Sequence, residues 1–112
     1  MTFGARTEHA AGTTVVVFTG DLDIASEAEA VAALEAALDG AGVLVADLRE
    51  LDFLDSTGVR VLLSADLRAR EEGVRFGVAR GDGMVRRLLE VTRIDQRFPV
   101  VDDPAELTAP AQ

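Results

Sequence analysis

A chain of 112 residues, 48% apolar and 28% charged, has the size and balance of one globular domain, not of two domains or a disordered segment. Its formal net charge of −9 argues against binding to nucleic acid or an anionic membrane and favours a partner with a basic face. The lack of cysteine excludes disulfides and thiolate metal sites, and neither the single histidine, His9, nor the carboxylate spacing indicates a metal or cofactor site.

Hydrophobic periodicity predicts strands that alternate with helices along the whole chain. In chain order we expect a weak strand at 2–9, a β-branched strand at 13–20 that stops at Gly20, a helix over 26–40, an apolar strand at 42–48, a helix from 59 to about 73, a strand at 74–79, a helix over 83–91, a short strand at 98–103, a last helical turn at 103–107 and a frayed tail at 108–112.

The helices carry start signals and apolar faces. The sequence "SEAE" at 26–29 forms a capping box, and Asp82 is placed to cap the third helix. Arg86 and Arg87 should point outward, with Arg86 in reach of Glu90 one turn on. The residues expected to face the core are Val31, Leu34 and Leu38 in the first helix, Val59, Leu62, Leu63 and Leu67 in the second, and Met84, Leu88 and Val91 in the third.

Two acidic turns that carry hydroxyl groups follow the second and third expected strands. They are "GDLDIAS" at 20–26 and "DFLDSTG" at 52–58. Strands joined through helices form a mostly parallel sheet, and binding sites gather at the carboxyl ends of such strands. Both turns sit at such ends, so the sequence predicts a binding site there. The excess of acids also lies in this half, since residues 1–60 hold 3 Arg against 11 Asp and Glu.

The segment "DSTG" at 55–58 has two physical interpretations. Aspartate, serine and threonine are all preferred helix caps, so one interpretation is a simple helix start. A helix needs one cap, however, and three candidates stand in a row. Gly58 within the first turn also has a helix cost of about 1 kcal/mol relative to alanine, which indicates a close approach of the backbone to another group.

Ser56 is also well placed for phosphorylation. The positive end of a helix dipole favours a phosphate, but Asp52, Asp55, Asp21 and Asp23 would oppose about 1.5–2 added negative charges. That balance suits a switch in a docking surface better than a stable phosphate-binding pocket.

Enzymatic functions are poorly supported. A serine hydrolase would need a G-x-S-x-G turn and a usable general base, and His9 is the only histidine. A response-regulator receiver needs a lysine, and a small nucleotide-binding enzyme needs a P-loop, but the chain has neither. We expect a binding protein that is not an enzyme.

The segment "VLVADLRELDFLDSTGVRVLL" resembles the signature of STAS domains, particularly of bacterial anti-sigma factor antagonists. The turn "GDLDIASE" and the C-terminal "MVRRLLEVTRIDQRFPVVDDPAEL" match the family at the expected places, so the resemblance covers nearly the whole chain. It implies an α/β fold with a four- to five-stranded mixed sheet and helices mainly on one face, in a single domain over residues 1–112. Arg93 stands where the family usually has glycine, in a turn that favours positive φ.

The resemblance also implies a function in transcription regulation and stress response. In such antagonists the serine at the position of Ser56 is phosphorylated by an anti-sigma factor serine kinase. The unphosphorylated form binds that kinase and frees the sigma factor, and a metal-dependent serine phosphatase restores it. The implied partner-binding residues are Asp21, Asp23, Asp55, Ser56, Thr57 and Gly58.

One alternative stays open within the same fold. The chain could be a non-switching STAS subunit of a transporter complex or of a stress-signalling scaffold. An intact serine motif in a short chain favours the antagonist. Since the chain shows neither an export signal nor an apolar run long enough to cross a bilayer, we expect it in the cytoplasm.

Overall fold

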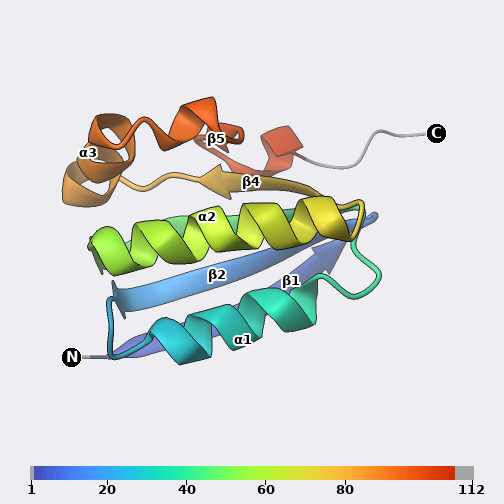
Figure 1. Cartoon of the computed structure of the whole chain (residues 1–112), viewed down its shortest axis with the longest axis horizontal. Coiled ribbons are helices and arrows are strands. Elements are labelled where there is room, and N and C mark those ends of the chain that lie inside the picture. The colour runs from blue at the N-terminus through green and yellow to red at the C-terminus, as the bar shows by residue number, and fades with distance from the viewer. Residues whose placement is uncertain (1, 108–112) are drawn as a thin grey trace.

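Five strands form one sheet, and two long helices pack against a single face of it (Figure 1). The computed structural model describes residues 2–107, so the tail expected at 108–112 lies outside it. The elements are β1 (Phe3–Ala10), β2 (Thr13–Leu22), α1 (Glu27–Ala37), β3 (Val43–Leu54), α2 (Ser56–Glu71), β4 (Arg75–Ala79), α3 (Gly83–Val91), the 3-10 turn η1 (Ile94–Gln96), β5 (Val100–Val101) and the 3-10 turn η2 (Pro104–Leu107).

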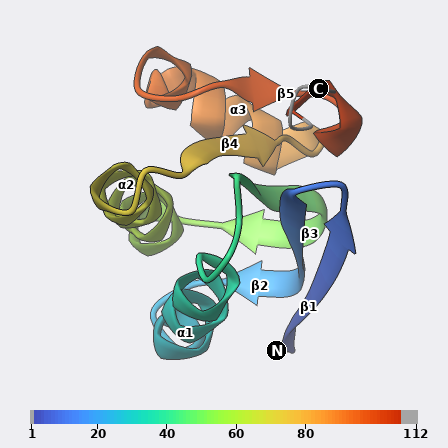
Figure 2. The ribbon, with the colours of Figure 1, turned by 90° about the vertical axis from the view of Figure 1, so that its right-hand side faces the viewer.

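The sheet is mixed, with the strand order β1-β2-β3-β4-β5. The first two strands form an antiparallel hairpin, and the strands from β2 to β5 run parallel to one another. Seen from the side, α1 and α2 lie on one face of the sheet, while η2 lies near the other (Figure 2). This arrangement confirms the predicted α/β mixed sheet with helices mainly on one face.

Both strands that lead into the predicted site are longer than the sequence suggested. β2 continues past Gly20 to Leu22, and β3 continues past Leu48 to Leu54. Gly20 therefore does not stop its strand. It adopts a φ of +82°, and a Cβ there would lie 2.0 Å from the Thr2 carbonyl oxygen, so glycine is needed where β1 approaches. The pairing of β2 with β3 is irregular on both sides of this residue, which the strand pattern does not reveal.

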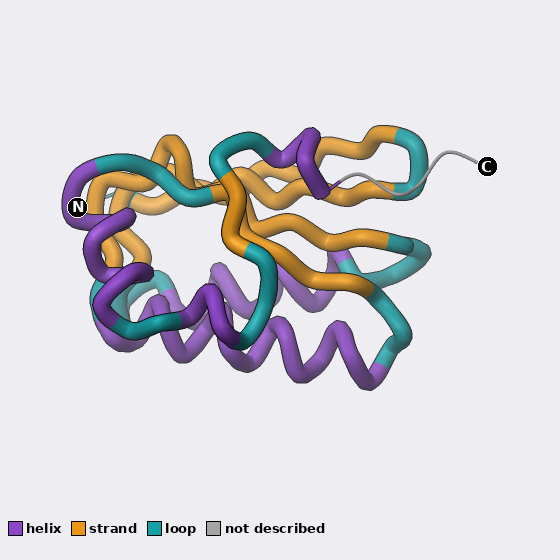
Figure 3. Tube along the Cα trace, turned by 90° about the horizontal axis from the view of Figure 1, so that it is seen from above, coloured by secondary structure: helices purple, strands orange, loops and turns teal. Residues whose placement is uncertain are grey.

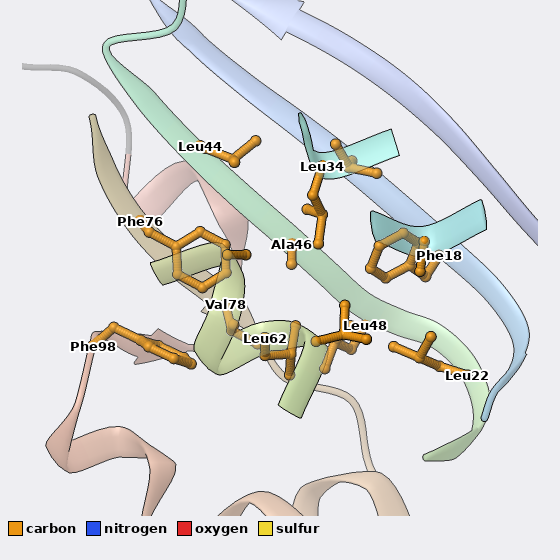
Figure 4. Close-up of a cluster of buried hydrophobic side chains, with 14 of the residues drawn as sticks. Phe18, Leu22, Leu34, Leu44, Ala46, Leu48, Leu62, Phe76, Val78 and Phe98 are labelled. Atoms are coloured by element: carbon orange, nitrogen blue, oxygen red, sulfur yellow. The ribbon is translucent and has the colours of Figure 1, made fainter. Parts of the chain in front are cut away.

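The main core lies between the sheet and the two long helices. Phe18, Leu44 and Leu48 reach it from the strands, and Leu62 enters from α2 (Figure 4). Each of these four side chains is fully buried. The same close-up shows Phe76 beside Phe98, whose rings meet edge to face at 4.9 Å. The tube view from above shows the two helices together on one side of the strands (Figure 3).

The predicted helix faces are partly wrong. Leu34, Leu38, Val59 and Leu62 are buried, and Leu63 and Leu88 are half-buried against the core. The exposed exceptions are Val31, Leu67, Met84 and Val91. The buried faces of α1 and α2 are instead completed by alanines, and α3 buries a different set of apolar residues from the predicted one. These residues are Ala30, Ala37, Ala65, Ala69, Val85 and Leu89. Small side chains let a helix lie close to a sheet. A prediction based on the spacing of large apolar residues does not include these alanines.

Two of the predicted caps are also wrong. Ser26 and Asp82 occupy the N-cap positions of α1 and α3, but neither side chain accepts a helix N–H bond. The ion pair predicted between Arg86 and Glu90 is present, with 3.4 Å between Nε and Oε2. Arg93 adopts the left-handed conformation that favours glycine, with a φ of +54°.

The second face of the sheet has a small core of its own. It comprises Val43, Val45, Ala79 and Leu107, and η2 supplies the last of these. Asp47 is buried beside them in the strand read as an apolar run. Its carboxylate accepts hydrogen bonds from Nε and Nη2 of Arg49, at 3.0 and 2.9 Å, so the buried charge is paired. Among residues 2–107, no helix is long and apolar enough to span a bilayer.

Candidate functional site

The strand register places the two acidic turns beside each other. In the parallel pairing of β2 with β3, Asp21 is opposite Phe53 and Leu22 is opposite Leu54. The turn into α1 and the start of α2 therefore leave the same edge of the sheet, at the left of Figure 1. The two turns thus meet at the carboxyl edge of the parallel strands, where the sequence placed each of them.

Asp55 caps the second helix. Its Oδ1 accepts hydrogen bonds from the backbone N–H groups of Thr57 at 2.9 Å and Gly58 at 3.2 Å. Ser56, the first residue of α2, is exposed, and its hydroxyl makes no hydrogen bond with any other residue that the structure describes. The cap and the free hydroxyl thus belong to different side chains, and Ser56 is not needed to start the helix.

Gly58 and Thr57 join the start of α2 to the end of β2. A Cβ on Gly58 would lie 2.2 Å from Leu54 Cδ1 and 3.1 Å from both Cγ and the carbonyl oxygen of Leu22. Thr57 is buried, with 8% of its surface exposed. The close approach inferred from the glycine is therefore present, and its partners are Leu22 and Leu54.

The turn between β2 and α1 is fixed by its own polar side chains. Asp23 Oδ1 accepts hydrogen bonds from the N–H groups of Ala25 at 3.0 Å and Ser26 at 3.3 Å. The buried Ser26 hydroxyl donates to the Asp21 carbonyl oxygen at 2.8 Å and accepts from Asp23 N–H at 3.0 Å. Ser26 thus stabilises this turn instead of capping α1. These bonds hold Ile24 at the tip, where 76% of it is exposed.

The predicted site residues divide into surface groups and supporting groups. Ser56 is exposed, Asp21, Asp23 and Asp55 are half-buried, and Thr57 and Gly58 are buried. The exposure of Ile24 and the role of Ser26 were not predicted, although the sequence does show Ile24 as an apolar residue within an acidic turn. A hollow of about 220 Å³ lies beside this turn and is lined by Thr2, Phe3, Asp21, Asp23, Ala25, Ser26 and Glu29. Within residues 2–107, no cluster of three or more histidine or carboxylate side chains is placed to hold a metal ion.

A family model described as "Mlab, STAS domain" matches residues 5–102. The chain belongs to the STAS domain family. The match includes both acidic turns, helices α1 to α3 and strands β2 to β5, so Asp21, Asp23 and the DSTG segment lie inside the matched residues.

Solved structures of anti-sigma factor antagonists share the fold of this STAS domain. One from Mycobacterium paratuberculosis is 27% identical, with a TM-score of 0.84, and the match covers 94% of this chain and 90% of that one. A STAS domain protein from Planctomyces limnophilus is 24% identical, with a TM-score of 0.77 and coverage of 91% and 92%. The phosphorylated form of the Bacillus cell fate determinant SpoIIAA is 16% identical, with a TM-score of 0.68 and coverage of 92% and 96%. No curated protein sequence matches the chain.

The two cap positions of this STAS domain give a matched stability test. We expect Asp55→Ala to lower the free energy of unfolding by about 1 kcal/mol, because it removes the acceptor for two N–H groups. Asp82→Ala should cost less than about 0.5 kcal/mol, since that side chain accepts no cap hydrogen bond. Urea unfolding followed by circular dichroism measures both values. Equal losses for the two variants would show that the Asp55 cap contributes nothing specific.

Proposed function

We propose that this STAS domain is an anti-sigma factor antagonist controlled by phosphorylation of Ser56. Unphosphorylated, it binds an anti-sigma factor serine kinase and so releases a sigma factor, and phosphorylation of Ser56 breaks that complex. The antagonists that share its fold support this role, and SpoIIAA has been solved in both unphosphorylated and phosphorylated forms. The domain is then the substrate of a kinase, not an enzyme.

The exposed Ser56 hydroxyl is the observation that carries the proposal. A kinase supplies the metal ion, the base and the positioning, so its protein substrate needs only an accessible hydroxyl. Ser56 offers one at the edge of the molecule, while the adjacent Thr57 is buried and Asp55 performs the capping. The modification therefore requires no unfolding of α2.

A phosphate on Ser56 would meet few favourable partners in the domain. Phosphates are stabilised at helix N-termini by free N–H groups, but Asp55 already accepts from those of Thr57 and Gly58. Asp21 and Asp23, on the neighbouring turn, add negative charge. Arg60, exposed one helical turn after Ser56, offsets part of it. The added charge would thus remain at the surface, where it repels an acidic or apolar partner face.

The neighbouring turn supplies the rest of the proposed docking surface. Ile24 projects from a turn that Asp23 and Ser26 hold rigid, so it can insert into an apolar pocket at little cost in conformational entropy. Asp21 and Asp23 beside it suit basic groups on the kinase. Asp55, Thr57 and Gly58 contribute by fixing the position of Ser56 instead of by direct contact. A metal-dependent serine phosphatase would then return the domain to its binding form.

Phosphorylation with a cognate kinase tests the proposal. The domain is incubated with the anti-sigma factor kinase encoded nearest to it and with ATP and Mg²⁺, and intact mass and fragment masses are then measured. We expect one added phosphate, on Ser56, and none on Ser56→Ala. Ser64 is a built-in control, because it is an exposed serine in the middle of α2. Phosphate on Ser64, or no phosphate with a kinase that binds tightly, would contradict the switch.

A second candidate shares the fold and the site. The matching family model carries the name Mlab, which does not itself indicate an anti-sigma factor antagonist. A non-switching STAS subunit of a transporter complex or a signalling scaffold is therefore the alternative. It predicts stable association with a partner that neither phosphorylates Ser56 nor responds to a charge there, so the same kinase experiment separates the two.

A further inference from the structure

A cluster of arginines surrounds a hollow at the end of α2 that is remote from Ser56. The hollow has a volume of about 250 Å³ and is lined by Asp66, Arg70, Val74, Arg75, Phe76, Arg97, Phe98 and Pro99. Ser56 and Arg70 stand at opposite ends of α2 and are about 20 Å apart along its axis. The hollow is therefore separate from the proposed phosphorylation site.

Two of these arginines have no ion-pair partner in the described part of the chain. Of the eleven arginines, six form an ion pair with a carboxylate among the described residues. Arg75 and Arg97 are not among the six, and both are exposed. Among residues 2–107, Asp66 is the one acid that lines the hollow, and Arg70 already pairs with it. In a chain with a net charge of −9, this is a local concentration of uncompensated positive charge.

Arg70 is held in a fixed position beside them. Its Nε lies 3.2 Å from Oδ2 of Asp66, which is 4% exposed, and its Nη2 donates to the Arg97 carbonyl oxygen at 2.9 Å. Its Nη1 donates to none of the described residues. A favourable interaction with the helix dipole would explain an arginine in the last turn of α2. It does not explain Arg75, which opens β4, or Arg97, which follows η1.

The wall of the hollow is apolar. Phe76 and Phe98 are each 5% exposed and pack edge to face, as Figure 4 shows, and Val74 and Pro99 complete the lining. Guanidinium groups bind carboxylates through paired hydrogen bonds, and an apolar wall beside them accepts an aliphatic side chain. A polyanion such as nucleic acid would meet the repulsion of the whole acidic surface, whereas a short segment would not.

We propose that this arginine hollow binds an acidic peptide segment of a partner protein, with a glutamate or aspartate on the arginines and an apolar side chain on the phenylalanine wall. The site acts independently of the charge at Ser56. It would allow a second protein to be bound while the opposite end of α2 is engaged or released.

Nuclear magnetic resonance titration tests this site. The probe is a blocked peptide of alternating glutamate and leucine, and its control replaces each glutamate by glutamine. We expect the acidic peptide to shift the resonances of Arg75, Arg97 and Phe98, and the control peptide to shift none. The double variant Arg75→Gln/Arg97→Gln should bind about tenfold more weakly, since it removes two charged hydrogen-bond donors.

A charge-matched variant supplies the control. Arg60→Gln/Arg87→Gln removes the same charge from exposed arginines outside the hollow and should bind the peptide within about twofold of the parent. If both double variants bound the peptide equally weakly, net charge alone would explain the loss of affinity and the proposal would be overturned. Tighter binding of oligothymidylate than of the peptide would overturn it too. Binding by Ser56→Asp should be unchanged, so failure here leaves the switch at Ser56 untouched.

Discussion

Ser56→Asp is expected to weaken binding of the anti-sigma factor kinase about 100-fold, whereas Ser56→Ala keeps it within about twofold. The alanine variant removes a hydroxyl that makes no hydrogen bond within the described domain. The aspartate variant places a charge at the centre of the proposed interface, beside Asp21 and Asp23, where the cap of Asp55 has already taken two of the helix N–H groups. Isothermal titration calorimetry with the purified kinase measures the three affinities.

Ser64→Asp is the matched control for this charge. Ser64 is exposed on the same helix, two turns beyond Ser56, and the change in net charge is identical. We expect its affinity to stay within about threefold of the parent, because only long-range repulsion is altered. If Ser64→Asp weakened binding as much as Ser56→Asp, overall charge and not the Ser56 site would govern the complex. Equal affinity of Ser56→Ala and Ser56→Asp would favour the non-switching alternative.

The alternation of strands and helices could be predicted because its causes are local. β-Branched runs and helical spacing mark the elements, and strands joined through helices run parallel and bring their carboxyl ends to one edge of the sheet. The free hydroxyl of Ser56 could not be read from "DSTG", because Asp55, Ser56 and Thr57 are all competent caps. Only the geometry of the helix start assigns the cap to Asp55 and buries Thr57.

The features that the sequence did not predict have a different cause. Their side chains make contacts that the usual patterns for helix caps and apolar helix faces do not include, or contact residues that are distant in sequence. Ser26 looked like a helix cap, yet its hydroxyl bonds back to Asp21 and Asp23. Val31 and Met84 looked like core residues, yet alanines and Val85 occupy those faces. The arginine hollow joins residues from α2, β4 and the segment after η1, and no single stretch of sequence contains it.

Gly58→Ala is expected to reduce both the stability of the domain and its affinity for the kinase. Replacing glycine by alanine inside a helix normally raises the free energy of unfolding by about 1 kcal/mol. Here the new Cβ would meet Leu54 Cδ1 and the side chain and carbonyl oxygen of Leu22. Leu54 and Leu22 are fully buried, so neither can move aside without disturbing the core. Overpacking of this kind costs about 1–3 kcal/mol, so after the gain of about 1 kcal/mol is subtracted we expect a net loss of up to about 2 kcal/mol in the free energy of unfolding.

The same substitution should weaken kinase binding by more than its loss of stability explains. With a loss of up to about 2 kcal/mol the variant stays mostly folded, since domains of this size are usually stable by about 5 kcal/mol or more. Relief of the clash, however, moves the end of β2 away from α2, and with it the turn that presents Asp21, Asp23 and Ile24 beside Ser56. A separation of only about 1 Å would break a surface that acts as one unit. Urea unfolding and calorimetry on Gly58→Ala, with Ser64→Ala as the control on the same helix, measure both effects. If a destabilised Gly58→Ala variant bound the kinase with full affinity, the kinase would not depend on the relative position of the two turns.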